Sequence, residues 1–156
     1  MTRPAASRHP DADSGHWLAR NLALLQGLFD DYERARLSTD ADSDRRKQDA
    51  RNRLTTALDR ILQDISGRDG ATACVVSFEG LLISHAGSLP DFEALAAVSE
   101  KCFRDAARDT RPMALGTLSQ MVIVGEEHKL VLFRIGAMVL GILSPRGTVL
   151  SQVLGE

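Results

Sequence analysis

The chain has 156 residues, of which 44% are hydrophobic and 26% are charged, and its formal net charge is −2. This length is typical of one domain with a buried core, and the weakly acidic balance argues against a nucleic-acid-binding protein. The sequence contains no apolar run long enough to span a bilayer and no apolar leader after Met1. We therefore expect a cytoplasmic protein that does not act at a membrane.

The first two segments of the chain are an expected disordered tail and an amphipathic helix. Residues 1–15 are rich in Pro, Ala and Asp, which is typical of disorder. In the segment 16–37, apolar residues recur at steps of three and four, which predicts a helix from His16 to Arg36. The residues of this apolar stripe are Leu18, Leu22, Leu25, Phe29 and Tyr32.

A second helix is predicted after the acidic residues Asp40, Asp42 and Asp44, because negative charge favours the amino-terminal end of a helix. It ends near Gly67 and Gly70, which permit the chain to turn. Its apolar stripe follows helical spacing closely and consists of Leu54, Ala57, Leu58, Ile61, Leu62 and Ile65.

The rest of the chain predicts a hairpin, a helix and three further strands. The hairpin strands are Ala71–Ser77 and Leu81–Ala86, the helix is Asp91–Thr110, and the later strands are Leu115–Val124, Lys129–Ile135 and Met138–Leu143. Short turns favour antiparallel pairing, so we expect an α+β fold in the order α-α-β-β-α-β-β-β. This fold has one five-stranded antiparallel sheet with helices on both faces. Residues Gly147–Glu156 leave room for a short helix or an extended tail at most.

No motif in the sequence predicts catalysis, a metal site or a cofactor. The four histidines do not pair with each other or with Cys74 and Cys102 at metal-ligand spacing. The segment Asp40–Asp44 opens like a calcium loop, but Arg45 and Arg51 occupy the positions that require Gly and Glu. Phosphate-binding loops and nucleophile elbows are also missing. We therefore expect a protein that is not an enzyme, with a hydrolase based on Cys102 as a weaker alternative.

Residues 45–156 resemble the Roadblock/LC7 family, which includes the bacterial MglB-type regulators. The resemblance rests on the apolar hairpin Ala73–Ser84 and on the helix start Asp91–Ala97, with Leu115-Gly116, Val122–Gly125 and Gly136–Leu140 matching the last three strands. The turn has Glu79 where the family usually has Asp. Family members also commonly end with a helix that packs beside the first one, and Gly147–Glu156 is too short to replace it.

The extra helix His16–Arg36 has two interpretations in view of this missing helix. In the first, it covers the vacant sheet face with Leu18, Leu22, Leu25 and Phe29. In the second, it is an arm that binds a partner.

The resemblance implies a homodimer, or a dimer with a paralogous Roadblock protein, that joins the strands Leu115–Val124 edge to edge. The helices Asp91–Thr110 would then lie side by side. The strand itself is compatible with this arrangement, because it lacks the lysines and prolines that protect an exposed edge. The alternative is a strand that is paired and covered within one chain. The expected dimer or partner interface consists of Ala94, Val98, Lys101, Asp105, Leu118, Gln120, Val122 and Val124.

The resemblance further implies a non-catalytic platform that binds and regulates, or scaffolds, a Ras-like small GTPase. Charged residues Glu93, Glu100, Arg104 and Arg108 are expected to form a rim that faces the GTPase. A less favoured possibility is that Arg104 or Arg108 acts as an arginine finger. The alternative function is a small-molecule sensor of the profilin, longin or PAS kind, which requires a cavity between the sheet and the helix.

Overall fold

The computed structural model describes residues 17–67 and 71–148, and these contain an antiparallel sheet flanked by helices. The predicted tail 1–15 and the end of the chain from residue 149 lie outside the described residues. The elements in chain order are α2 (Trp17–Arg36), α3 (Ser43–Ser66), β1 (Ala73–Phe78), β2 (Leu81–Gly87), α4 (Phe92–Asp109), the 3₁₀ helix η1 (Arg111–Met113), β3 (Gln120–Val124), β4 (His128–Ile135) and β5 (Met138–Pro145).

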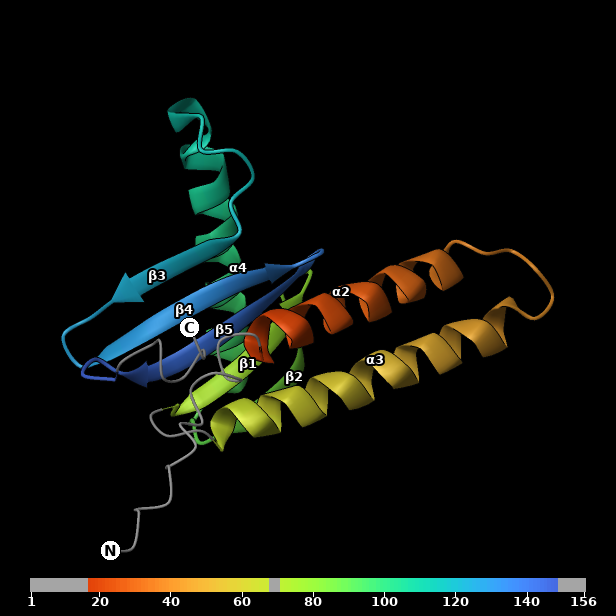
Figure 1. The fold of residues 1–156 in the computed structure, drawn as a ribbon, viewed down its shortest axis with the longest axis horizontal. Coiled ribbons are helices and arrows are strands. Elements are labelled where there is room, and N and C mark those ends of the chain that lie inside the picture. Colours follow the sequence, from red (N-terminus) through yellow and green to blue (C-terminus); the bar gives the residue numbers. More distant parts are fainter. Residues whose placement is uncertain (1–16, 68–70, 149–156) are drawn as a thin grey trace, which may run out of the picture.

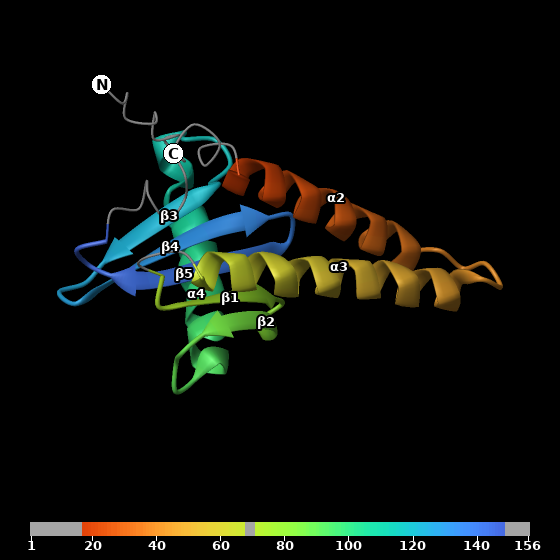
Figure 2. The ribbon, with the colours of Figure 1, turned by 60° about the horizontal axis from the view of Figure 1, so that its bottom comes forward.

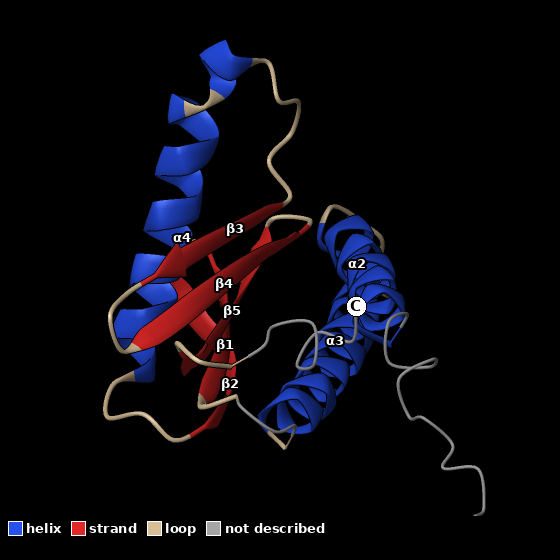
Figure 3. Cartoon of the chain, turned by 60° about the vertical axis from the view of Figure 1, so that its left-hand side comes forward, coloured by secondary structure: helices blue, strands red, loops and turns tan. Residues whose placement is uncertain are grey.

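The five strands form one sheet in the order β2-β1-β5-β4-β3, and every neighbouring pair is antiparallel. Helices α2 and α3 cover one face, and α4 lies on the other (Figures 1 and 3). The predicted α+β class, the order of the elements and the placement of helices on both faces are therefore confirmed. Because β3 is last in the order, one of its edges has no partner strand among residues 17–67 and 71–148.

Helices α2 and α3 form an antiparallel hairpin that extends well beyond the sheet (Figure 2). The predicted apolar stripe of α3 is buried along its whole length. In α2, Leu18, Leu25 and Phe29 are buried, whereas Leu22 is only partly buried. These side chains share one core with Val131 from the sheet, so the apolar side of α2 faces the interior of the molecule.

The β1–β2 turn forms as the sequence predicts. Glu79 and Gly80 both have positive φ, at 52° and 78°, and the flanking residues Phe78 and Leu81 are paired. This is the backbone pattern of a two-residue turn whose twist matches the two strands. Glycine adopts such a conformation without strain, which explains the Gly in the second position.

Helix α4 begins where the sequence places it, because Asp91 caps it. The Asp91 carboxylate accepts a hydrogen bond of 3.0 Å from the backbone N–H of Ala94, which has no partner within the helix. The helix packs on β1, β2 and β5 and fully buries Ala96, Ser99 and Phe103. It makes fewer contacts with β3, although its end projects past that strand, and part of the sheet face near β3 is thinly covered.

The predicted strand Leu115–Val124 is wrong in its first half, because β3 begins only at Gln120. Just before the first residue of β3, the backbone N–H of Arg134 in β4 donates a hydrogen bond of 3.1 Å to the carbonyl of Ser119. Strand β4 then ends at Ile135 and the chain turns. Residues before Ser119 therefore have no strand to pair with, and Leu115 is 62% exposed.

Among the helices of the described ranges, none is long and apolar enough to cross a membrane.

Candidate protein-interaction surface

Helix α4 separates the predicted interface residues from most of the predicted rim residues. An α-helix turns by about 100° per residue, so Ala94, Val98, Lys101 and Asp105 lie on one flank, which we call the interface flank. Glu93, Glu100 and Arg104 lie about 110° round the helix from this group, and Arg108 lies between the two groups. One helix thus offers two neighbouring surfaces, which meet where Arg108 pairs with Asp105.

The interface flank is partly apolar and partly occupied by an ion-pair network. Val98 is 52% exposed, and Ala94 is also exposed. The Asp105 carboxylate lies 4.0 Å from Lys101 Nζ and 3.6 Å from the Arg108 guanidinium. Lys101 and Asp105 therefore already have partners within the helix, whereas Val98 and Ala94 are free to contact another chain.

Strand β3 presents its outer edge and two exposed valines. Val122 is 46% exposed, Val124 is 56% exposed, and Gln120 is exposed as well. Their alternation places them on the α2–α3 face of the sheet, opposite the face that carries α4. The predicted interface residue Leu118 is not on this strand, because it lies in the connection before β3, where it is partly buried.

The expected interface residues did not include four apolar residues near this edge. Met121 and Ile123 point to the α4 face, where they pack only partly against Phe103 and its neighbours. Met113 and Leu115 are 65% and 62% exposed in the segment that follows α4. The end of α4 and η1 project past β3 (Figure 3), so all four lie toward the open edge of the sheet. The continuous apolar run Met121–Val124 was the available signal for the first two, because successive side chains of a strand point to opposite faces.

Beside the flank of α4 that carries Glu100 and Arg104, an open groove contains three of the four predicted rim residues. It has a volume of about 540 Å³ and lies between the carboxyl-terminal half of α4 and the β4–β5 turn. Glu93 does not line it. The buried side chains Phe103, Met138 and Val139 contribute its apolar part. Its charged residues are Glu100, Arg104, Arg108, Arg111 and Arg134.

The charges of this groove are mostly positive, and some of them have partners. Glu100 accepts a hydrogen bond from the backbone N–H of Gly80. Arg134 Nε donates to the carbonyl of Gly136 at 3.0 Å. The hydrogen bond and charge of Asp109, with a contribution from Asp105, raise the pKa of Arg108 and keep it cationic.

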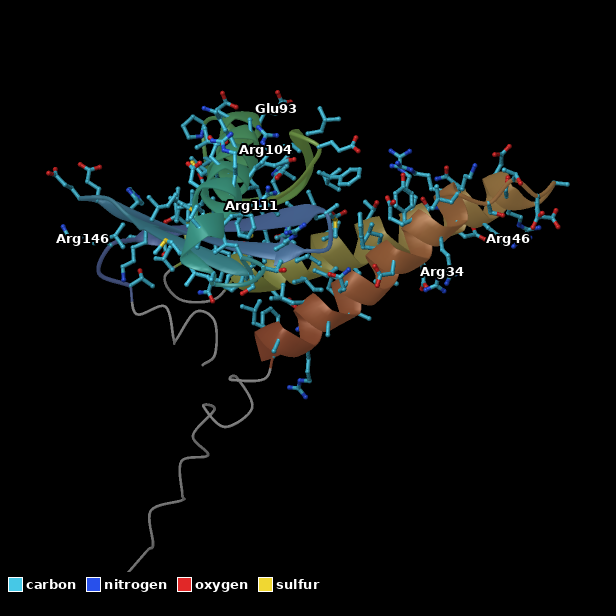
Figure 4. The ribbon with its side chains drawn as sticks, turned by 90° about the horizontal axis from the view of Figure 1, so that it is seen from above. Arg34, Arg46, Glu93, Arg104, Arg111 and Arg146 are labelled. Carbon is cyan, nitrogen blue, oxygen red and sulfur yellow. The ribbon has the colours of Figure 1, made fainter. Side chains whose placement is uncertain are left out.

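Two arginines of the groove lack such partners. Within the ranges 17–67 and 71–148, Arg104 and Arg111 form no ion pair or side-chain hydrogen bond. Figure 4 shows both along α4, away from Arg34 and Arg46 on the helical hairpin.

The cysteines give no support to the hydrolase alternative. Burial raises the pKa of the Cys74 thiol to about 12, and the smaller effect of a hydrogen bond from the backbone of Ala86 lowers this pKa. The Sγ atom of Cys74 lies 3.3 Å from the carbonyl oxygen of Leu62. Cys102 packs against the apolar cluster below α4 and has no hydrogen-bond partner among the described residues. Within those residues, no three His, Cys, Asp or Glu side chains gather to hold a metal ion.

The sensor alternative requires an enclosed cavity between the sheet and α4, and the structure is closely packed beneath the middle of the helix. A Cβ added at Gly141 of β5 would lie 2.9 Å from Ser99 Oγ. The helix thus approaches the sheet at a position where only glycine fits, and this contact leaves no room for a ligand beneath Ser99.

Comparison with known proteins identifies the fold through structure rather than sequence. Neither the models of known families nor the curated proteins give a match. The structure of a Roadblock/LC7 domain from Streptomyces avermitilis is similar, with a TM-score of 0.57 and 21% identity over 63% of this chain and 85% of that one. MglB from Myxococcus xanthus is similar with a TM-score of 0.58 and 18% identity over 64% of this chain and 77% of that one.

The chain has the Roadblock/LC7 fold. A gliding protein MglB from Thermus thermophilus gives a further match, with a TM-score of 0.54 and 15% identity over 67% of this chain and 80% of that one. In this example of the Roadblock/LC7 fold, the open β3 edge and the two flanks of α4 are the exposed features that fit a protein partner best.

Proposed function

We propose that this protein is a non-catalytic dimeric platform in the cytoplasm that binds and regulates, or scaffolds, a Ras-like small GTPase. The observation that carries the proposal is the outer edge of β3, which has no partner strand among the described residues and which carries the exposed side chains of Val122 and Val124. The similarity of the fold to MglB structures supports the same function.

The dimer follows from the physics of an exposed strand edge. An edge with free N–H and C=O groups and no protective charge pairs readily with another strand. Most homodimers have a two-fold axis, so the simplest partner for β3 is β3 of a second copy. The half-covered Met121 and Ile123 would gain cover from the second chain. One similar solved structure, at a TM-score of 0.54, is described as MglB with a tetrameric arrangement, which supports self-association.

The GTPase would bind on the α4 side of the platform, at the rim formed by Glu93, Glu100, Arg104 and Arg108. A rigid surface of mixed charge steers a partner into one orientation and needs no catalytic side chain. In this proposal Arg104 binds the partner protein and is not inserted into a nucleotide site.

Light scattering of the purified chain tests the dimer. The expected mass is twice the 17.0 kDa of one chain. Val122→Arg places a charge at the β3 edge and should give a monomer. Leu81→Arg is the matched control, because Leu81 is 68% exposed on β2 at the other edge of the sheet. A wild-type monomer at high concentration, or a monomer only with Leu81→Arg, contradicts the proposed interface.

Binding of a purified Ras-like small GTPase from the same organism tests the second half of the proposal. The GTPase, loaded with GDP or with a non-hydrolysable GTP analogue, is passed over the immobilised chain. Saturable binding that depends on the nucleotide is expected, and the chain alone should not hydrolyse GTP. No binding of any small GTPase of that organism in either nucleotide state contradicts the proposal.

A further inference from the structure

The groove beside α4 combines two properties that rarely occur together by chance on a surface helix. Four arginines converge on it from α4, η1 and β4, which are separate elements of the fold. Between them lies an apolar floor, to which the accessible side chains of Ala107 and Ala137 contribute beside the nearly buried Phe103 and Val139. We propose that this groove binds an acidic segment of a protein partner, with an apolar side chain of that segment on the floor and its carboxylates on the arginines. The inference rests on the proposed function in one respect only, namely that the acidic segment belongs to a protein partner of the platform.

The charge of the groove is not neutralised within the described residues. Its one acidic side chain, Glu100, is held by the N–H of Gly80, and Arg108 is the arginine that Asp105 and Asp109 occupy. The guanidinium groups of Arg104 and Arg111 have no hydrogen-bond or ion-pair partner in the part of the chain that the structure describes. Arginine suits carboxylates because its planar fork donates two parallel hydrogen bonds.

Arg134 is prepared for the same task by the β4–β5 turn. Its Nε donates to the carbonyl of Gly136, in the turn that follows β4. This bond fixes the side chain at the rim of the groove while its terminal nitrogens remain without a described acidic partner. A side chain that is already ordered loses less conformational entropy when it binds a ligand.

The apolar floor favours a peptide over a free anion. A site for inorganic phosphate alone needs donors and gains nothing from Phe103, Met138 and Val139. A peptide that alternates acidic and apolar residues can pair its carboxylates with the arginines and pack its apolar side chains on the floor of the groove. The volume of about 540 Å³ lies within the range of about 300–1,000 Å³ that is usual for ligand pockets.

The test is fluorescence anisotropy with a short fluorescein-labelled peptide in which glutamates alternate with phenylalanine and leucine. The wild-type chain should bind it saturably, and raising the salt concentration should weaken binding because the contacts are ionic. The double variant Arg104→Gln/Arg134→Gln should bind about tenfold more weakly or worse, which corresponds to the loss of two charge-assisted contacts. Arg45→Gln/Arg53→Gln removes the same charge from exposed positions on α3 and should bind as the wild type does.

Two altered peptides and two other probes complete the design. Replacing the glutamates by glutamine, or the apolar residues by serine, should weaken binding to the wild type. Full displacement of the peptide by millimolar inorganic phosphate overturns the proposal, because the groove would then be a general anion site. Binding to phosphatidylserine vesicles without binding to the peptide also overturns it, as does equal affinity of the wild type and Arg104→Gln/Arg134→Gln.

This assay requires no GTPase, so the two proposals fail separately. Loss of peptide binding beside intact dimerisation and GTPase binding refutes the groove alone. Peptide binding through the arginines, without any GTPase binding, refutes the proposed function alone. Thermal melting of each variant confirms that the exposed arginine substitutions leave the fold intact.

Discussion

Gly141 of β5 lies directly beneath Ser99 of α4, so close that a Cβ at position 141 would be 2.9 Å from Ser99 Oγ. The same Cβ would lie 3.3 Å from Leu132 Cδ2. Ser99 Oγ is buried and has no hydrogen-bond partner among the described residues. This contact sets the distance between the sheet and the helix that carries both proposed binding surfaces.

Gly141→Ala should therefore destabilise the protein by about 1–3 kcal/mol, the usual cost of forcing extra atoms into a packed core. Denaturant unfolding at a fixed protein concentration measures the change. Gly27→Ala is the control, since a Cβ there meets nothing within 4 Å and alanine favours a helix. Adding Ser99→Ala to Gly141→Ala should restore part of the lost stability. If the free-energy changes of the two single variants simply add in the double variant, the proposed contact is contradicted.

Adjacent leucines in α2 distinguish a helix that belongs to the core from one that serves only as an arm. Leu25 is 1% exposed and Leu24 is 44% exposed. Leu25→Ala should lower the free energy of unfolding by about 2–5 kcal/mol, because it removes buried methyl groups and leaves a cavity. Leu24→Ala should have little effect. Equal, small changes in both variants would favour the arm that binds a partner.

Asp91 should stabilise the protein through the hydrogen bond by which it caps α4, and not through its negative charge alone. Asp91→Ala leaves the Ala94 N–H without its acceptor and should cost about 0.5–2 kcal/mol. Asp91→Asn keeps an acceptor oxygen and should retain most of the stability. Thermal melting of the two variants decides the point, and equal losses would show that the hydrogen bond is unimportant.

The two thiols should differ sharply in reactivity. Cys74 is fully buried, whereas Cys102 is partly exposed. Titration of the native protein with a thiol reagent should modify Cys102 first, and Cys74 should react only on unfolding. Rapid modification of both thiols in the native state would contradict the structure.

The raised pKa of Cys74 also predicts how stability depends on alkaline pH. Burial raises this pKa from 9.0 to about 12 in the folded state. Between these values the unfolded chain has already lost the thiol proton that the folded chain keeps, so the free energy of unfolding falls as the pH rises. Below pH 9 this residue should have no such effect. Denaturant unfolding of Cys74→Ala should lack this component of the alkaline loss.

Periodicity and turn chemistry alone were sufficient to predict most of the elements of this chain. The apolar stripe of α3, the Glu79-Gly80 turn and the helix start at Asp91 depend on residues close together in the chain, and each appears where predicted. The first half of the strand Leu115–Val124 failed because strand length depends on a partner. Strand β4 turns at Gly136, and the residues before Ser119 have nothing to pair with.

The candidate site also combines features that the sequence predicted with features that only the tertiary structure determined. From the sequence alone, α4 was a helix with charged residues and a valine on its exposed side, and the absence of catalytic motifs directed attention to binding. Tertiary structure placed Arg134 with Arg104 and Arg111 along one groove, which Val98 does not line. Local patterns determine helices and turns because their hydrogen bonds join near neighbours. A groove and an open sheet edge depend on how distant segments pack, and that packing is decided only when the whole chain has folded.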